Sequence, residues 1–548
     1  ATMKSEAIQP QKTSKEEKLR WNWNTPIVTG AKNSNNLYVA AQYLYKSIDQ
    51  GRNWKRISPD LTTNDKKKQE QEESGGLSAD NTSAENHCTI FTLAESSLDE
   101  NLIWVGTDDG NLQVTIDGGT TWTNVTANVT LSGIAKGAWV SSIQPSQFDK
   151  NTVYATFENH MYGDFKTYLA KSIDLGKTWK RITSPEFNSF AHKIKEDLIN
   201  KNVLFLGTEM GLFATLDGGD NWFRMKNNIP EYALVRDLQI HPKTHDLIVA
   251  THGRGIYILD DIRPMRNLTK DIWEQDVVFL PTPDLTLNNG KLGWGGPETS
   301  GGWSVGNPNE IPTINYYMKQ RLSSGKVTVE ILDDKGILIQ SIPGTIRRGI
   351  NKVTWNLRGI PPKVAAGGTK MDGAGFTAPM VLPGTYTVKL KVKDKEYVST
   401  VKCIHDATNK DLTDTDRKLV YDKAMQLQGL YNSVNNSIDS INYYQKSLKT
   451  DTVAFNKNKN AKVFYDDLQK VKAELMATKK TSIFADEERV REKISSLYGT
   501  FCSMESKPNS TQLEAIDVLQ QEYVTQQDNL KKAIVKNLPK LKMVKDIK

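Results

Sequence analysis

The stretch TDDGNLQVTIDGGTTW at residues 107–122 decides the fold, because its second half recurs along the chain with the same internal spacing. The recurring pattern is Ser/Thr-x-Asp-x-Gly-x-x-Trp, which we call the box motif. The four copies are Ser47/Asp49/Gly51/Trp54, Thr115/Asp117/Gly119/Trp122, Ser172/Asp174/Gly176/Trp179 and Thr215/Asp217/Gly219/Trp222. Agreement at four fixed positions indicates one structural unit repeated along residues 20–262.

The box motif predicts a tight β-hairpin corner and no catalysis. An Asp carboxylate accepts hydrogen bonds from backbone N–H groups a few residues further on, and the Gly adopts the positive φ that a tight turn requires. The Trp covers the turn from the returning strand. We therefore assign structural roles to the Asp and Trp of each copy, which are Asp49, Trp54, Asp117, Trp122, Asp174, Trp179, Asp217 and Trp222.

Repeats of this size with about four short strands each are the signature of a β-propeller. The predicted blades cover residues 20–60, 88–126, 138–184, 190–227 and 234–262, and the last of them has no box motif. Five blades are few for a closed ring, because an open ring leaves unpaired sheet edges. We expect further blades upstream of Ala1, and we expect these blades to pack with that upstream propeller region.

The blades are flanked by segments without repeats. Residues 1–19 are polar and without periodicity, which predicts a linker. Within the blades, the charged insert at 62–76 is predicted to be a loop excursion. Residues 263–310 form a Gly-rich connector whose Trp294 and Trp303 are expected to pack it; it lacks the strand-before, helix-after context of a phosphate-binding loop.

Two further domains follow the connector. Residues 311–405 return to alternating apolar and polar positions around Trp355, which predicts an immunoglobulin-like β-sandwich. Residues 406–548 carry apolar residues at three- and four-residue spacing, with Thr413/Asp416 and Thr511/Glu514 as capping pairs. This pattern predicts an antiparallel helical bundle. The predicted fold class is mainly β: a propeller, then a sandwich, then a C-terminal α-helical bundle.

Composition excludes several classes of function. No segment has eighteen consecutive apolar residues, so no transmembrane segment is predicted. Cys88, Cys403 and Cys502 lie in three different regions and form neither a disulfide framework nor a zinc site. The 71 basic residues are interspersed with 64 acidic ones, which predicts a solvated helix surface and no nucleic-acid partner. The chain has no Gly-x-Ser-x-Gly elbow for Ser-His-Asp chemistry, and no cofactor is predicted.

The candidate functional residues lie in the turns that the repeats place opposite the box motifs. Successive strands of a blade are antiparallel, so the turns between second and third strands gather on one face of the propeller, and the box motifs on the other. The predicted binding residues on this box-free face are Asp108, Asp109, Glu158, His160, Asp164, Glu209, His252 and Arg254.

Three interpretations of this acid-rich face stay open. Asp108, Asp109 and Glu209 are candidates for the paired carboxylates of glycoside cleavage, one with a raised and one with an ordinary pKa. The same Asp-Asp-Gly and His-Gly-Arg-Gly sequences also serve as plain turn sequences, and this interpretation is favoured. Binding of a structural cation by these acids is the third, with no metal site assigned from the sequence.

The box motif matches the Asp-box of sialidases, sortilin-type receptors and xyloglucan-cleaving hydrolases. Together with the words RWNWNTPI at 20–27, ATHGRGIYILDD at 250–261 and LPGTYTV at 382–388, the chain resembles the C-terminal part of a bacterial Asp-box (BNR-like) family, called sortilin-like or glycosyl hydrolase. The resemblance implies a longer protein exported beyond the inner membrane, to the periplasm or cell surface. It implies no activity, because the hydrolase name rests on the structural box.

The function predicted from these observations is an exported propeller-based binding or assembly protein that holds a protein, peptide or glycan partner at the bacterial cell envelope. The first alternative is a glycoside hydrolase that uses carboxylates of the box-free face. The second is a structural subunit of an envelope complex. Binding or structure is favoured over catalysis, because the sandwich and bundle sequences contain no candidate nucleophile, metal cluster or cofactor loop.

Overall fold

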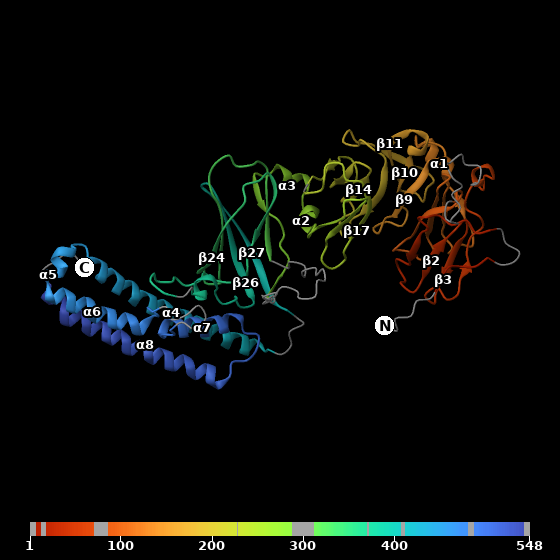
Figure 1. The fold of residues 1–548 in the computed structure, drawn as a ribbon. Coiled ribbons are helices and arrows are strands. Elements are labelled where there is room, and N and C mark those ends of the chain that lie inside the picture. Colours follow the sequence, from red (N-terminus) through yellow and green to blue (C-terminus); the bar gives the residue numbers. More distant parts are fainter. Residues whose placement is uncertain are drawn as a thin grey trace. The chain divides into compact units, whose positions relative to one another are not determined.

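The computed structural model describes residues 7–12, 18–70, 86–226, 228–287, 312–369, 372–406, 412–479 and 487–541. The chain divides into two compact units, Ala1–Ile272 and Trp273–Lys548, and each is described by itself (Figure 1). The later part of the predicted insert at 62–76, most of the predicted linker at 1–19 and the Gly-rich run with both connector Trp residues lie outside the described residues.

The first unit consists of small antiparallel sheets whose strands pair in chain order, drawn in red to yellow-green in Figure 1. Four sheets have four strands and the fifth has three. Each sheet falls within one predicted blade, so the prediction of propeller-type blades is confirmed. The strands are β1 (Ile27–Thr29), β2 (Leu37–Ala40), β3 (Leu44–Ser47) and β4 (Lys55–Arg56); β5 (Ile90–Glu95), β6 (Ile103–Thr107), β7 (Leu112–Thr115) and β8 (Thr123–Asn124); β9 (Trp139–Pro145), β10 (Val153–Asn159), β11 (Asp164–Ser172) and β12 (Lys180–Ile182); β13 (Ala191–Glu196), β14 (Leu204–Thr208), β15 (Gly211–Thr215) and β16 (Phe223–Arg224); and β17 (Val235–Ile240), β18 (Leu247–Thr251) and β19 (Ile256–Leu259).

Short helices occupy some of the connections. They are η1 (Lys67–Gln69), α1 (Thr126–Leu131), η3 (His160–Tyr162), α2 (Arg263–Arg266) and α3 (Lys270–Glu274). The β10–β11 hairpin of blade three is longer than the β6–β7 hairpin because its strands are longer, with 7 and 9 residues against 5 and 4. Its turn contains η3 and covers residues 160–163, and the β6–β7 turn covers residues 108–111.

A separate apolar core joins each blade to the next one along the chain. Blades one and two share the core around Tyr38 and Ile103, and blades two and three share the core around Trp104 and Phe157. The cores between blades three and four and between four and five are built in the same way. Among the described residues, no apolar core joins blade five to blade one.

In the described part of the first unit, one face of blade five is therefore not covered by another blade. Its strands β18 and β19 pair in the register in which β14 and β15 pair in blade four, so Ile256 and Ile258 correspond to Leu212 and Ala214. Leu212 and Ala214 are buried under blade five, whereas Ile256 and Ile258 are 71% and 60% exposed. The positions of the third strand that are buried in blade four are thus exposed in blade five.

Each box motif forms the same hydrogen-bond network at the turn after the third strand. In the second copy, the Thr115 hydroxyl donates to Asp117 Oδ1 at 2.8 Å and accepts from the Gly119 N–H at 3.0 Å. Asp117 in turn accepts from the backbone N–H of Thr121 at 2.9 Å and from its hydroxyl at 2.6 Å. These hydrogen bonds, that of the Thr121 side chain first, lower the pKa of Asp117 to about 2. A carboxylate held ionised by its own turn matches the structural role predicted for it.

The other copies repeat these contacts. The corresponding hydroxyl-to-carboxylate distances are 2.8, 2.9 and 2.7 Å for Ser47–Asp49, Ser172–Asp174 and Thr215–Asp217. The indole N–H of Trp122 donates to the Ile57 carbonyl of the preceding blade at 3.1 Å, and that of Trp222 donates to Gly219 within its own corner. The Trp residues therefore fasten the corners in two different ways.

The second unit begins with two sheets that share one apolar core around Trp355. One sheet has the order β20-β22-β25 and the other β21-β27-β26-β23-β24. The strands are β20 (Val277–Phe279), β21 (Leu285–Leu287), β22 (Thr313–Met318), β23 (Val327–Leu332), β24 (Leu338–Pro343), β25 (Gly349–Thr354), β26 (Gly384–Val392) and β27 (Lys395–His405). The predicted connector at 263–310 thus supplies two strands, one of which, β21, pairs parallel to β27. The immunoglobulin-like topology stays a prediction.

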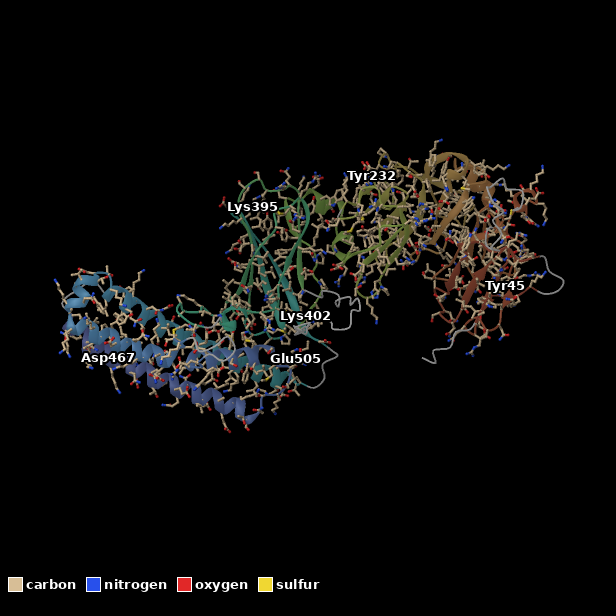
Figure 2. All side chains as sticks on the ribbon, in the orientation of Figure 1. Tyr45, Tyr232, Lys395, Lys402, Asp467 and Glu505 are labelled. Atoms are coloured by element: carbon tan, nitrogen blue, oxygen red, sulfur yellow. The ribbon has the colours of Figure 1, made fainter. Side chains whose placement is uncertain are left out.

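The C-terminal region is helical, as predicted, and is drawn in blue in Figure 1. Its elements are α4 (Asp414–Leu448), α5 (Thr452–Lys457), α6 (Lys459–Leu475), α7 (Val490–Ser503), α8 (Ser510–Asn537) and η5 (Leu538–Lys540). The predicted Thr413/Asp416 capping box is present at the start of α4. At its surface, Asp467 of α6 accepts from Lys536 and Asn537 of α8 at 3.2 and 3.1 Å (Figure 2).

The predicted capping pair Thr511/Glu514 is wrong. Helix α8 starts two residues earlier, with Asn509 as its N-cap. Asn509 Oδ1 accepts from the Gln512 N–H at 2.9 Å, and Gln512 Oε1 accepts from the Asn509 N–H at 3.0 Å. Asn is as good an N-cap as Ser or Asp, and its side chain reaches the third residue of the helix equally well.

The described parts of the long 358–378 loop, residues 358–369 and 372–378, pack into the helical core. Ala365 and Ala374 of this loop belong to the same apolar core as the helices, and η4 (Gly373–Phe376) lies within it. Asp372 is buried and accepts from the hydroxyl of Tyr431 at 2.6 Å, and one of its oxygens lies 3.5 Å from Arg491 Nε. The helices therefore complete their core with residues from outside 406–548.

Candidate functional site

All eight predicted site residues lie in or beside the turns between second and third strands of their blades. The box motifs follow the third strand, at the opposite end, because neighbouring strands are antiparallel. The sequence thus predicted the positions of these turns, and the side-chain contacts divide the eight residues into separate groups.

Asp108 is a buried carboxyl with internal partners. It accepts from the Thr89 N–H at 2.8 Å, from the Thr89 hydroxyl at 2.6 Å and from the Asn22 amide at 3.3 Å. Burial raises the pKa of Asp108 to about 7, against the effect of these hydrogen bonds. The His87 ring places Nδ1 3.6 Å from Asp108 Oδ2, and burial lowers the pKa of His87. Asp108 thus ties its turn to the first strand of its own blade.

Asp109 points to the connection between blades one and two. It accepts from the N–H and hydroxyl of Thr63 at 2.7 and 2.6 Å, and from the hydroxyl of Thr107. Both carboxylate oxygens are occupied, and the residue is 4% exposed. Neither Asp108 nor Asp109 presents a free carboxylate oxygen to solvent, so these two residues favour the structural interpretation of the Asp-Asp-Gly turn.

Glu158 and Glu209 come together on either side of a histidine that sequence reasoning missed. His192 of β13 is buried, with Nε2 2.9 Å from Glu209 Oε2 and Nδ1 3.2 Å from Glu158 Oε2. Arg236 of β17 places Nη1 3.1 Å from the same Nδ1. We call Glu158, His192, Glu209 and Arg236 the His192 cluster. It combines three blades, since its members come from blades three, four and five.

The protonation of His192 decides which neighbours it bonds. An imidazolium donates from both nitrogens and bridges the two carboxylates, whereas a neutral ring with its proton on Nε2 accepts from Arg236 at Nδ1. When the His192 ring is neutral in this way, the buried Glu158 Oε2 has no hydrogen-bond donor among the described residues. The cluster therefore holds donors and acceptors that a polar ligand can satisfy.

An aromatic surface adjoins the His192 cluster. His160 stacks on Phe190 at 4.6 Å, and Phe190 lies edge-on to His192 at 5.1 Å. In the same hairpin, Met161, Tyr162 and Phe165 are 65%, 63% and 60% exposed. We call Met161, Tyr162 and Phe165 the aromatic hairpin patch. Large apolar side chains exposed together on one short turn are unusual on a protein surface that has no partner.

The remaining predicted residues have simpler roles. Asp164 accepts from the Tyr168 hydroxyl at 2.6 Å, which holds the base of the blade-three hairpin. His252 and Arg254 are exposed in the β18–β19 turn, beside Gly253 and Gly255, which both adopt positive φ. The structure thus groups Glu158, His160 and Glu209, and it leaves Asp164, His252 and Arg254 out of the His192 cluster.

Two of the four residues of the His192 cluster, His192 and Arg236, carried no usable signal in the sequence. His192 and Arg236 each occupy the second position of a first strand, and first strands β13 and β17 lie side by side. The repeat predicts that correspondence, but only the register between blades shows that the two side chains meet. In the described ranges, no three His, Cys, Asp or Glu side chains come together in a way that could hold a metal ion. Of the helices in the described part of the chain, none has the length and apolar content to span a bilayer.

No known family model matches the chain, and no curated protein matches its sequence. Similar solved structures include an ancestral GH74 enzyme (14% identity, 71% of this chain, 63% of the other, TM-score 0.34) and YCF48 bound to D1 peptide (12%, 43%, 66%, 0.27). A third is PorZ of Porphyromonas gingivalis, described as a bacterial surface component of the type-IX secretion system (13%, 69%, 59%, 0.23). The chain covers less than two thirds of each of these structures. At these TM-scores the similarity is distant, so the propeller-type architecture rests on the sheets of this chain.

Proposed function

We propose that this chain is a binding protein that holds a protein or peptide partner on the box-free face of its blades. The observation that carries the proposal is the aromatic hairpin patch beside the His192 cluster. Binding energy at protein interfaces concentrates in a few large side chains, aromatic ones above all, that become buried on association. Met161, Tyr162 and Phe165 are exposed side chains of this kind.

The His192 cluster suits the backbone of a peptide partner. A peptide offers N–H donors and C=O acceptors in alternation, and the cluster offers carboxylate acceptors in Glu158 and Glu209 and a guanidinium donor in Arg236. The apolar patch and the polar cluster lie next to each other through Phe190. The pair therefore provides an apolar anchor with a polar rim, which is the usual composition of a protein interface.

A peptide-display experiment tests the proposal. We expect the full chain to enrich peptides from a random twelve-residue library. Their affinity should fall by at least roughly 30-fold when Tyr162 and Phe165 are both changed to Ala, since a single hot-spot residue contributes about 2 kcal/mol. The matched control is Ile116→Ala with Ile173→Ala, which removes two equally exposed apolar side chains from box corners. Enriched peptides that lose affinity in the control and keep it in the hairpin variant would contradict the proposal.

Glycoside hydrolysis is the second candidate, and one observation favours it. Asp108 has a pKa of about 7, which is the property required of a general acid. Its burial and its hydrogen bonds to Thr89 speak against access by a sugar. A panel of glycans tests this candidate, with Asp109→Asn as a folded control. Turnover that disappears in Asp108→Asn would replace the binding proposal with the enzymatic one.

Export to the cell envelope, completion of the blades by upstream sequence and a structural role in an envelope complex belong to the same proposal. They rest on the resemblance to bacterial Asp-box proteins. Fractionation of the source cells, followed by immunodetection, tests the location. Recovery of the protein with the cytoplasmic fraction alone would contradict it.

A further inference from the structure

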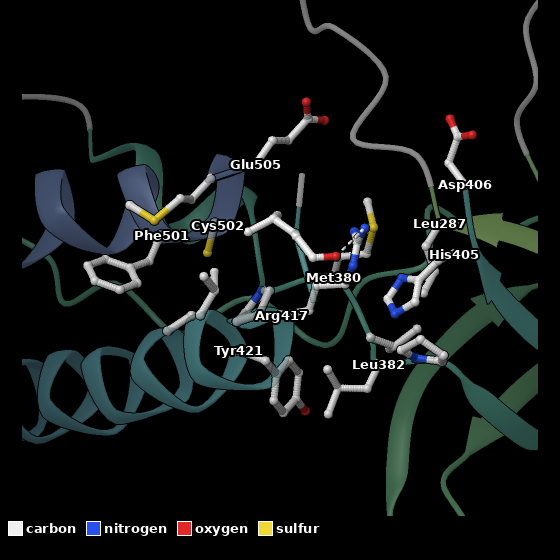
Figure 3. Close-up of a pocket in the computed structure, with 17 residues that line it drawn as sticks. Leu287, Met380, Leu382, His405, Asp406, Arg417, Tyr421, Phe501, Cys502 and Glu505 are labelled. Atoms are coloured by element: carbon white, nitrogen blue, oxygen red, sulfur yellow. Dashed lines mark hydrogen bonds between the residues drawn. The ribbon is translucent and has the colours of Figure 1, made fainter. Parts of the chain in front are cut away.

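The second unit contains a cavity of about 410 Å³ between its sheets and its helices (Figure 3). The walls come from segments far apart in the sequence: β21, the chain just before β26, the start of α4 and the end of α7. Leu287, Met380, Leu382, Val420 and Phe501 form the apolar part of the lining, and polar groups make up the larger part of its exposed surface. Cavities of this size are typical of small-molecule sites.

His405 is a polar group of the lining whose bonding is incomplete. Both of its ring nitrogens are buried, and Nδ1 has no hydrogen-bond partner among the described residues. Its Nε2 lies 3.1 Å from Asp414 Oδ1. Burial, and then the positive charge of Arg417, lower the pKa of His405, so the ring is neutral at neutral pH. The carboxylate beside Nε2 favours the proton on that nitrogen, which leaves the lone pair on Nδ1. A ligand that meets Nδ1 must therefore donate a hydrogen bond.

The charged residues around the cavity argue against an anionic ligand. Arg417 lines it, and so do Asp406 and Glu505 (Figure 3). A carboxylate ligand would be attracted by one of these groups and repelled by two, whereas an ammonium ligand would be attracted by two and repelled by one. An uncharged head group meets no repulsion, and it loses less solvation than either ion on leaving water.

We propose that this cavity binds a small neutral amphiphile, whose head group donates a hydrogen bond to Nδ1 of His405 and whose apolar tail lies against Leu287, Met380 and Phe501. The site is separate from the His192 cluster and does not depend on the function proposed for the blades. The chemical class of ligand is a hydroxyl- or amide-headed chain.

Two probes with the same apolar tail test the class of ligand. Calorimetric titration of the full chain with 1-octanol should show saturable binding of one molecule, and octanoate should bind at least roughly 10-fold more weakly, because its carboxylate cannot donate to Nδ1. Equal or tighter binding of octanoate would overturn the proposal, and so would the absence of saturable octanol binding.

Variants of the full chain test the place and the contact. Leu382→Trp should fill the cavity and abolish octanol binding, with circular dichroism showing an intact fold. His405→Phe keeps the ring and removes the acceptor, so affinity should fall by roughly 2- to 10-fold, the equivalent of one hydrogen bond. The control His252→Phe changes an exposed histidine of the first unit and should leave binding unchanged. Octanol binding that survives Leu382→Trp, or that His405→Phe does not weaken, would overturn the proposal.

Discussion

At the scale of single residues, a hydroxyl and a carboxylate close each box corner. The hydroxyl of Thr115 both donates to Asp117 and accepts from the Gly119 N–H, and Thr115 is 1% exposed. Removal of this hydroxyl leaves a partly buried N–H without its acceptor, which costs part of the free energy of desolvating that group. The conformation of the corner therefore depends on a hydroxyl side chain that has no predicted catalytic or binding role.

We expect Thr115→Val to lower the free energy of unfolding by about 1–3 kcal/mol, because Val keeps the shape and loses both hydrogen bonds. Urea unfolding followed by tryptophan fluorescence measures this. Thr120→Val is the control, since Thr120 is exposed and makes one hydrogen bond to the Asp117 carbonyl. Equal effects of the two substitutions would show that the buried hydroxyl does not hold the corner.

Asp108 makes stability depend on pH in a predictable direction. Its pKa is raised from 3.8 to about 7, so the folded chain binds a proton that the unfolded chain releases. Stability is then greatest below pH 4 for this group and falls as pH rises to about 7. The loss amounts to ~4 kcal/mol when the shift is converted at 1.36 kcal/mol per pH unit.

Asp108→Asn removes this titration. We expect wild type to lose more unfolding free energy than Asp108→Asn between pH 4.5 and 7.5, with the difference set by Asp108 alone, because the other titrating groups are shared. Parallel pH profiles of the two proteins would mean that the Asp108 carboxyl is ionised in the fold at little cost.

At the scale of elements, the helices and the 358–378 loop form one core. Arg491 of α7 is 1% exposed and bonds to Glu492 and to the carbonyl of Ala365 in the loop, with Asp372 at 3.5 Å. The apolar stripes of residues 406–548 predicted helices that pack among themselves. They could not show that a loop of the preceding sheets supplies partners for a buried guanidinium.

Asp372→Ala should therefore destabilise the second unit by about 3–5 kcal/mol, because it leaves the buried Arg491 with less compensating charge. Lys363→Ala breaks an ion pair of the same loop with Asp439, where Lys363 is largely exposed, and should change stability by less than about 1 kcal/mol. Thermal unfolding of both variants makes the comparison. A fragment of residues 406–548 should likewise unfold at a lower temperature than one that begins at residue 273.

At the scale of the whole molecule, the sequence predicted what repeats and what has a regular period. The box motif located the blades because a Gly, an Asp and a Trp at fixed spacing form the same tight turn in each copy. The three- and four-residue spacing of apolar residues located the helices. The sequence did not predict the His192 cluster, whose members meet across three blades, or the parallel strand β21. Such contacts depend on register between elements, which no local pattern encodes.

The uncovered face of blade five predicts where the first unit begins to unfold. Each blade shares a core only with its neighbours in the described part of the chain, so the unit resembles a one-dimensional array in which stability is a sum of nearest-neighbour terms. An array of this kind frays from its ends. Backbone amides of β18 and β19 should exchange with deuterium before those of β9 and β10, whose blade has a neighbouring blade on both sides. A partner bound to Ile256 and Ile258 would stabilise blade five and slow the exchange of its amides.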